Sequence, residues 1–306
     1  MADARPVAGL IPILATPFTS SGALDRTGFE RLVDFELDCG VDGLAVFGMA
    51  SEGFALTVED RRVLLSVLAE RVPAGLPVIA GVNATSTATA VEQALFARDL
   101  GASALMVLPP FLAKPSPAEV VDFYGRLAER AGVPVMVQDA PATTGVSLPI
   151  GLLTELSRLP GVESVKIEAP PTAPKVAAVA AAVPGWQLLG GQNALFVLEE
   201  YAGGAVGTMP ACEFSDELAA VLRVLPADPL AAHRRFNILL PLIRFGLQPG
   251  IAHAVHKEVL VRRGVIDCAK VRNPVSALDR HSLAALELIL SMIALPRWEH
   301  APVRTH

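Results

Sequence analysis

The sequence is poor in aromatic side chains and in charge. Of its 306 residues only 5% are aromatic and 18% are charged, while 52% are hydrophobic. This composition is typical of a globular chain and not of a disordered one. Acidic residues outnumber basic ones by 31 to 25, which gives a formal charge of −6. The sequence therefore predicts no nucleic-acid surface, because phosphate binding needs a clustered basic footprint.

Cysteines and long apolar runs are also scarce. The three cysteines are far apart and match neither a metal-ligand spacing nor a disulfide framework, which predicts a reducing, cytoplasmic location. They are Cys39, Cys212 and Cys268. No uninterrupted apolar stretch reaches the ~18 residues of a membrane span, so we predict no membrane association. Prolines break the apolar N-terminal run, which we interpret as a first strand and not as a signal peptide.

What the chain has is an alternation of short apolar runs with amphipathic segments. Such runs, apolar on both faces, are typical of buried parallel strands. The eight runs are Leu10–Ala15, Gly43–Phe47, Pro77–Val82, Ala104–Leu108, Pro134–Gln138, Glu163–Ile167, Gln187–Gly191 and Ala205–Met209. Helix starts follow several of them, as at Thr57 and at Ser116-Pro117.

Eight β-then-α units spaced by roughly 30 residues predict a (β/α)₈ TIM barrel. A doubly wound sheet is the alternative, but no Gly-x-Gly-x-x-Gly follows the first run. Beyond about Phe214 the pattern is helical only. We predict a single-domain protein with a barrel core over residues 1–212 and C-terminal helices over residues 213–306 that pack on the barrel.

Lysine is rare, and Lys166 is the only one inside a predicted strand, between Val165 and Ile167. Barrel enzymes build their active sites at the carboxyl ends of the strands, where Lys166 falls. Apolar surroundings disfavour a charged amine, and the neutral amine is the nucleophile that attacks a carbonyl. A structural lysine in a buried ion pair with a carboxylate such as Glu52 or Glu168 is the open alternative.

Glu168 lies two residues after Lys166. Because strand side chains alternate, the two side chains face the same side. A carboxylate beside the amine is placed to move protons during imine chemistry. A plain counter-ion, or a side chain turned away on the following loop, is the alternative.

The turn Gly48-Met49-Ala50-Ser51 follows the second predicted strand. Small residues let backbone N–H groups hold a substrate carboxylate, and the Ser51 hydroxyl adds a further donor. Many Gly/Ser turns have no such role, so this motif is weak by itself.

Four segments then follow one another in a distinctive order. They are GLIPILATPFTSSGALD, FGMASEGFALTVEDR, VPVMVQDAPATTGVSLP and VESVKIEAP. Together they resemble the dihydrodipicolinate synthase and N-acetylneuraminate lyase superfamily of class I Schiff-base lyases, over about residues 8 to 295. The resemblance implies the barrel with C-terminal helices, Lys166 as the Schiff-base lysine, a small 2-keto acid as substrate, and a homotetramer or homodimer.

The chain departs from this family at its acid/base residue. Where relatives carry Tyr-Asn, this sequence has Gln138-Asp139. The family's tyrosine acts as general acid/base, and an amide does not titrate in that role. The other tyrosines, Tyr124 and Tyr201, lie in helical patterns and are poor replacements.

Three further departures concern the synthase branch. Met49 and Phe111 stand where the synthases have a hydroxyl residue and a second tyrosine, and Thr143 stands at their carboxylate-binding arginine. The resemblance therefore argues against condensation with aspartate semialdehyde.

Val-Gln-Asp-Ala-Pro followed by Lys-Ile-Glu is similar to the pattern of 2-keto-3-deoxy-sugar-acid dehydratases, especially those for 2-keto-3-deoxyarabonate. In those enzymes the lysine forms an imine at C2, a proton leaves C3 and the C4 hydroxyl departs as water. This implies catalytic roles for Lys166, Glu168 and Gln138. The expected substrate-binding residues are Ala50, Ser51, Thr144, Gly191 and Asp139.

Three alternatives stay open. A pyruvate-dependent aldolase uses the same lysine but breaks a carbon–carbon bond, and a barrel without catalysis only binds a keto acid. A metal-dependent enzyme is the third, but all six histidines lie beyond the eighth predicted strand, away from the strand ends that hold barrel metals. We predict neither a metal nor a cofactor.

Overall fold

The computed structural model describes residues 7–299, in which eight parallel strands form one sheet in the order β1-β8-β7-β6-β5-β4-β3-β2. The strands are β1 (Gly9–Leu10), β2 (Leu44–Val46), β3 (Val78–Val82), β4 (Ala104–Val107), β5 (Val135–Asp139), β6 (Val162–Ile167), β7 (Gln187–Gly190) and β8 (Gly207–Thr208). Ile13 forms parallel bridges to both Ala45 and Ala211, which closes the sheet into a ring. The predicted (β/α)₈ barrel is confirmed.

The first and last strands are shorter than the apolar runs that predict them. Proline explains the difference, because Pro12 and Pro210 have no N–H to donate to a neighbouring strand. The chain still runs alongside its neighbour. The N–H of Ile11 donates to Thr208 at 3.0 Å, and the N–H of Ile13 donates to the carbonyl of Pro210 at 2.7 Å.

Helices separate the strands and continue beyond β8. They are α1 (Arg26–Cys39), α2 (Val58–Arg71), α3 (Thr87–Asp99), α4 (Pro117–Ala131), α5 (Pro141–Thr144), α6 (Ile150–Leu156), α7 (Thr172–Ala182), α8 (Val197–Ala202), α9 (Ser215–Val224), α10 (Pro229–Gly246), α11 (Ala252–Arg262) and α12 (Arg280–Ile293), with short 3₁₀ turns η1 (Gly53–Ala55) and η2 (Gln192–Ala194). The predicted starts at Thr57 and Ser116 are confirmed. Each forms a capping box, with Asp60 and Glu119 respectively.

Two apolar cores lie on the two sides of the sheet. The smaller one fills the barrel interior and consists of Ile11, Ile13, Ala45, Ile79, Ala104, Met106, Met136, Leu189 and Met209. The larger one lies between the sheet and the helices. The interior is therefore packed, and a substrate has room only above it, at the carboxyl ends of the strands.

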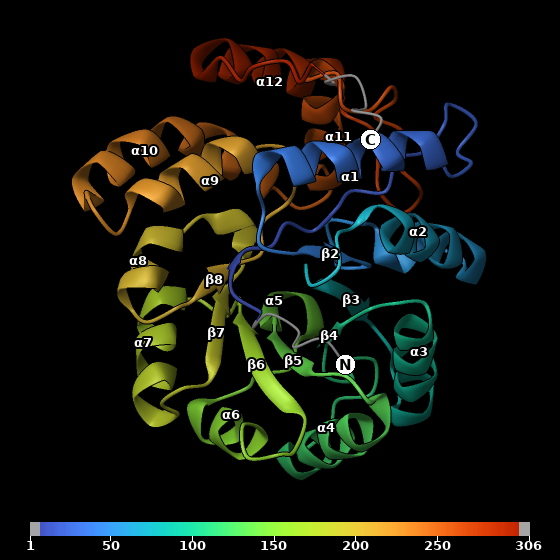
Figure 1. Cartoon of the computed structure of the whole chain (residues 1–306), viewed down its shortest axis with the longest axis vertical. Coiled ribbons are helices and arrows are strands. Elements are labelled where there is room, and N and C mark those ends of the chain that lie inside the picture. Colours follow the sequence, from blue (N-terminus) through green and yellow to red (C-terminus); the bar gives the residue numbers. More distant parts are fainter. Residues whose placement is uncertain (1–6, 300–306) are drawn as a thin grey trace.

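The C-terminal helices gather with α1 at one end of the molecule (Figure 1). β8 ends at Thr208 and α9 begins at Ser215, on either side of the predicted boundary at residue 212. The division into a barrel core and a helical appendage stays a prediction, and its outermost residues, 1–6 and 300–306, lie outside the described part. Among residues 7–299 no helix is long and apolar enough to cross a membrane.

Candidate active site

Lys166 lies on β6 with its side chain toward the barrel interior. Its neighbours in register are Gln138 on β5 and Leu189 on β7, and Leu189 belongs to the interior core. Only 4% of Lys166 is exposed, so its ammonium group sits directly above the apolar floor of the barrel. This is the strand-end position that the sequence predicts.

The carboxylate of Glu168 is the ion-pair partner of Lys166. The distance from Lys166 Nζ to Glu168 Oε1 is 3.4 Å. Gln138 Nε2 donates to the other oxygen, Oε2, at 2.7 Å, and the N–H of Gln192 donates to Oε1 at 3.4 Å. Gln192 also donates its side-chain amide to the Glu168 carbonyl at 2.6 Å. These bonds hold the Glu168 carboxylate facing the Lys166 amine. Of the two carboxylates named as possible ion-pair partners of Lys166, Glu168 is therefore the one in contact, while Glu52 pairs with Lys257.

Gly191 makes room for that carboxylate. A Cβ placed on Gly191 would lie 2.6 Å from Glu168 Oε1 and 2.7 Å from its Cδ. Any larger residue would therefore push Glu168 away from Lys166. The expected contact between Gly191 and substrate stays a prediction, while its role in placing Glu168 follows from the geometry.

The turn after β2 lies over the barrel interior, where the sequence places a carboxylate site. Ala50 packs against the interior core, and its N–H donates to no atom of residues 7–299. Ser51 is fully buried, and its hydroxyl has no hydrogen-bond partner in that part of the chain. Thr16 donates to the Ser51 carbonyl at 2.7 Å and fixes the turn against the first strand. Both groups thus lack a partner within residues 7–299, and their contact with a substrate carboxylate stays a prediction.

The side chains of Thr144 and Asp139 bind other groups of the protein. The Thr144 hydroxyl bonds within its own turn, donating to the carbonyl of Ala140 at 3.0 Å. Asp139 pairs with Lys175 of α7 at 2.6 Å, on the helix side of the sheet. Burial raises the pKa of Asp139, and Lys175 opposes that effect. Both residues shape the loop after β5, and substrate contact by either stays a prediction.

Neither described tyrosine replaces the family's acid/base residue. The Tyr124 hydroxyl donates to the Val107 carbonyl at 2.7 Å, and burial raises its pKa well above the usual value. Burial likewise raises the pKa of Tyr201 to about 12. Neither phenol therefore ionises near neutral pH, and a role of Glu168, the carboxylate beside Lys166, in proton transfer stays a prediction.

Three residues near the site were not predicted. Gln192 directly follows the predicted strand Gln187–Gly191, but the sequence does not predict its two hydrogen bonds to Glu168. His253 and Lys257 of α11 contact the turn after β2: His253 Nε2 lies 2.8 Å from the Met49 carbonyl, and Lys257 pairs with Glu52. No local pattern points to this contact, because about 200 residues separate the partners.

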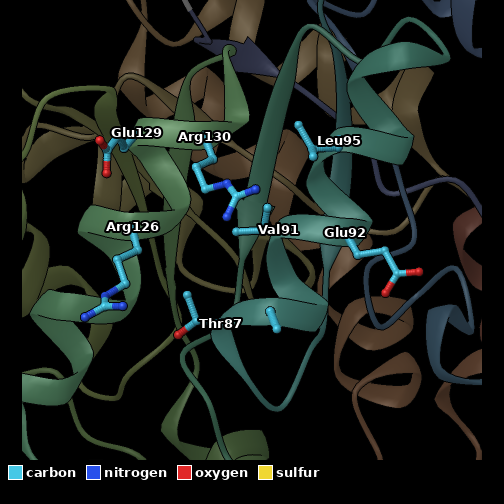
Figure 2. Close-up of a pocket in the computed structure, with 8 residues that line it drawn as sticks. Thr87, Val91, Glu92, Leu95, Arg126, Glu129 and Arg130 are labelled. Atoms are coloured by element: carbon cyan, nitrogen blue, oxygen red, sulfur yellow. The ribbon is translucent and has the colours of Figure 1, made fainter.

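A groove on another part of the molecule does not contain the residues of this site. It has a volume of about 670 Å³ and lies between α3 and α4 on the outer face of the barrel (Figure 2). Its lining includes Thr87, Glu92, Arg126 and Arg130. All of its lining residues belong to these two helices, and neither Lys166 nor any other lysine is among them.

Comparison with known proteins shows the family of the chain. The model of the Dihydrodipicolinate synthetase family matches residues 6–293. The chain belongs to this family. It is therefore an enzyme of the class I Schiff-base lyases, as its buried lysine suggests. Among residues 7–299 no three His, Cys, Asp or Glu side chains meet in a way that would hold a metal ion.

Individual members of the family are similar over most of the chain. An L-2-keto-3-deoxyarabonate dehydratase from Azospirillum brasilense is 33% identical, covering 95% of this chain and 97% of its own. A 4-hydroxy-tetrahydrodipicolinate synthase from Exiguobacterium sibiricum is 33% identical over 75% of this chain and 79% of its own.

Solved structures of the family share the fold. Dihydrodipicolinate synthase from Rhodopseudomonas palustris superposes with a TM-score of 0.87 at 27% identity, covering 94% of this chain and 97% of its own. The Escherichia coli K12 prophage protein YagE, solved with pyruvate, also gives 0.87, at 25% identity, with coverage of 94% and 99%.

Proposed function

We propose that this protein dehydrates a 2-keto-3-deoxy sugar acid through a Schiff base on Lys166. The observation that carries the proposal is the arrangement of three side chains above the barrel floor. The Glu168 carboxylate faces the Lys166 amine at 3.4 Å and is held from its other side by Gln138 at 2.7 Å. The similarity to the L-2-keto-3-deoxyarabonate dehydratase of Azospirillum brasilense supports the choice of substrate class.

The reaction begins at the amine. Lys166 Nζ attacks the C2 carbonyl of the keto acid, and water leaves as the imine forms. The imine withdraws electrons from C3, so a C3 proton becomes acidic. Glu168 takes that proton, and the electron pair is held as an enamine.

The hydroxyl at C4 then leaves. The enamine pushes electrons toward C4, and the C4–O bond breaks as the Glu168 carboxylic acid returns its proton to the departing oxygen. One water is lost in total, and hydrolysis of the remaining imine frees Lys166. Gln138 orients both the carboxylate and the hydroxyl without changing its own protonation.

The outer end of the site favours a neutral sugar chain over a second carboxylate. Thr143 and Met49 contact each other there, with the Thr143 hydroxyl 3.0 Å from the Met49 sulfur. By the family resemblance, Thr143 stands at the synthases' carboxylate-binding arginine. Without that cation a substrate with a second carboxylate lacks its counter-ion, whereas hydroxyl groups need only hydrogen bonds.

Product analysis tests the proposal. Purified protein is incubated with 2-keto-3-deoxy pentonates and hexonates, and we expect a keto acid lighter by one water. Borohydride added with substrate should reduce the imine and mark the peptide that contains Lys166. Lys166→Ala should lose the mark, and Lys270→Ala, a change of an exposed lysine, should keep it.

Two results would contradict the proposal. Pyruvate with an aldehyde would show an aldolase, and no adduct across a panel of keto acids would show that Lys166 is not a nucleophile.

We also propose that the protein is cytoplasmic and forms a homotetramer or homodimer. The family resemblance supports the assembly, and the three cysteines, all unpaired, suit a reducing compartment. Light scattering on the purified protein measures its mass in solution, and a monomer over the working concentration range would contradict the assembly.

A further inference from the structure

A second buried lysine lies behind the turn that follows β2. Lys257 of α11 is fully buried, and its ammonium group pairs with Glu52 Oε1, directly after Ser51. It also donates to the carbonyl of Lys270 at 2.8 Å. Burial lowers the pKa of Lys257 to about 8, and the charge of Glu52 opposes that effect.

The other oxygen of Glu52 is held by the same C-terminal segment. The N–H of Arg272 donates to Glu52 Oε2 at 2.8 Å. The Arg272 guanidinium lies 4.1 Å from the centre of the Phe18 ring, and Lys257 Nζ lies 4.2 Å from it. Both carboxylate oxygens of one loop residue are thus bound by groups more than 200 residues away.

The loop after β2 has a second contact with α11, through a residue one helical turn before Lys257. His253 Nε2 lies 2.8 Å from the Met49 carbonyl. Because a carbonyl only accepts, His253 donates through Nε2. Glu52 itself has a φ of 53°, a left-handed conformation that residues other than glycine rarely adopt. The contacts from α11 and Arg272 hold the turn in this form.

We propose that Lys257 and His253 are positioning residues, which hold the turn Gly48–Ser51 in the shape that receives the substrate carboxylate. This inference rests on the proposed function, since it assumes that Ala50 and Ser51 donate to the keto acid. A buried ion pair is often replaced by apolar residues without loss of stability. The stability of the fold therefore does not by itself require the Lys257–Glu52 ion pair, whereas a fixed shape of the turn Gly48–Ser51 does.

The test is a titration of borohydride trapping with pyruvate as the probe. The fraction of protein carrying the adduct on Lys166 is measured by mass spectrometry against pyruvate concentration. Lys257→Met keeps the length of the side chain and removes its charge, and His253→Ala removes the bond to Met49. Arg263→Met is the control, because Arg263 is also buried and pairs with Asp216 at 2.5 Å, away from the turn.

We expect the half-trapping concentration to rise about tenfold or more in Lys257→Met, because a buried charge is left unpaired beside the turn. His253→Ala should raise it about threefold or more, as the loss of one hydrogen bond does. At saturating pyruvate both variants should still be trapped. Arg263→Met should lower the melting temperature and leave the half-trapping concentration within about twofold of wild type.

The outcomes distinguish a failure of the proposed function from a failure of the positioning role. No adduct in the wild-type protein would overturn the proposed function itself. An adduct in wild type, with unchanged half-trapping concentrations in Lys257→Met and His253→Ala, would overturn only the positioning role. If Lys257→Met does not fold, His253→Ala decides, since His253 is only partly buried.

Discussion

Replacing Glu200 by glutamine should stabilise the protein at neutral and higher pH. Glu200 lies on α8 and is 1% exposed, and neither carboxylate oxygen has a hydrogen bond of normal geometry within residues 7–299. It packs so closely on β7 that a Cβ on Gly190 would lie 2.8 Å from its Cδ. The charge of this carboxylate is therefore poorly compensated.

The pKa of Glu200 shows the size of the effect. Burial raises it from 4.5 to about 7, while Thr172 and Lys166 act in the opposite direction. At about 1.4 kcal/mol per pKa unit, this rise corresponds to about 3 kcal/mol. Between pH 4.5 and about pH 7 the folded protein holds a proton on Glu200 that the unfolded chain has lost. The free energy of unfolding therefore falls as the pH rises through this range. Above about pH 7 the full cost is present.

Glu200→Gln keeps the shape and removes the charge. We expect the variant to be more stable than wild type by about 3 kcal/mol at about pH 8, and the gain to shrink toward about pH 5. Urea unfolding across this range measures both quantities. Glu199→Gln is the control, because Glu199 is its exposed neighbour and should change little. An equal pH dependence in Glu200→Gln and wild type would refute the reasoning.

Three further predictions concern the site and its support. Glu168→Gln should lower kcat by ~10²–10⁴-fold and leave the pyruvate adduct on Lys166 in place, because proton transfer is lost while imine formation is not. Gly191→Ala should lower kcat by ~10²-fold or more by displacing Glu168, whereas Gly151→Ala, with no atom within 4 Å of its new Cβ, should keep full activity. Lys175→Met should reduce the free energy of unfolding by about 3 kcal/mol, because Asp139 is left buried without its cation.

Each of these has a simple contrary result. Steady-state kinetics of Glu168→Gln at wild-type rates would remove Glu168 from the mechanism. Equal activity of Gly191→Ala and Gly151→Ala would show that Glu168 tolerates the added methyl group. Urea unfolding of Lys175→Met at wild-type stability would show that Asp139 is protonated or solvated in the folded protein.

The sequence predicts the barrel because each unit carries its own signals. A parallel strand that is apolar on both faces, followed by a capped helix as at Thr57 and Ser116, needs no distant partner to be recognised. The same reasoning overestimates the first and last strands, where Pro12 and Pro210 interrupt the ladder. Strand length depends on the neighbouring strand as well as on the run itself.

That Lys166 and Glu168 share a face follows from the sequence alone, since residues two apart in extended backbone point to the same side. Glu168 lies just after β6, and its N–H still donates to the carbonyl of Asp139 at 2.9 Å. The family motifs then indicate the chemistry. Their contact at 3.4 Å agrees with that expectation. The same alternation turns Asp139 to the opposite side from Gln138, and its carboxylate does lie on the helix side of the sheet with Lys175.

Only the tertiary structure decides what surrounds this pair. Gln192 reaches Glu168 across 24 residues, and Lys257 reaches Glu52 from α11, which no periodicity in the sequence relates to β2. Local patterns set which face of a strand or helix is apolar, because that depends on residues two to four apart. Contacts between the ends of different elements depend on how the closed barrel brings those ends together. The place of Lys166 at a strand end was determined by the sequence, and the contacts of Gln192 with Glu168 and of Lys257 with Glu52 were determined by the fold.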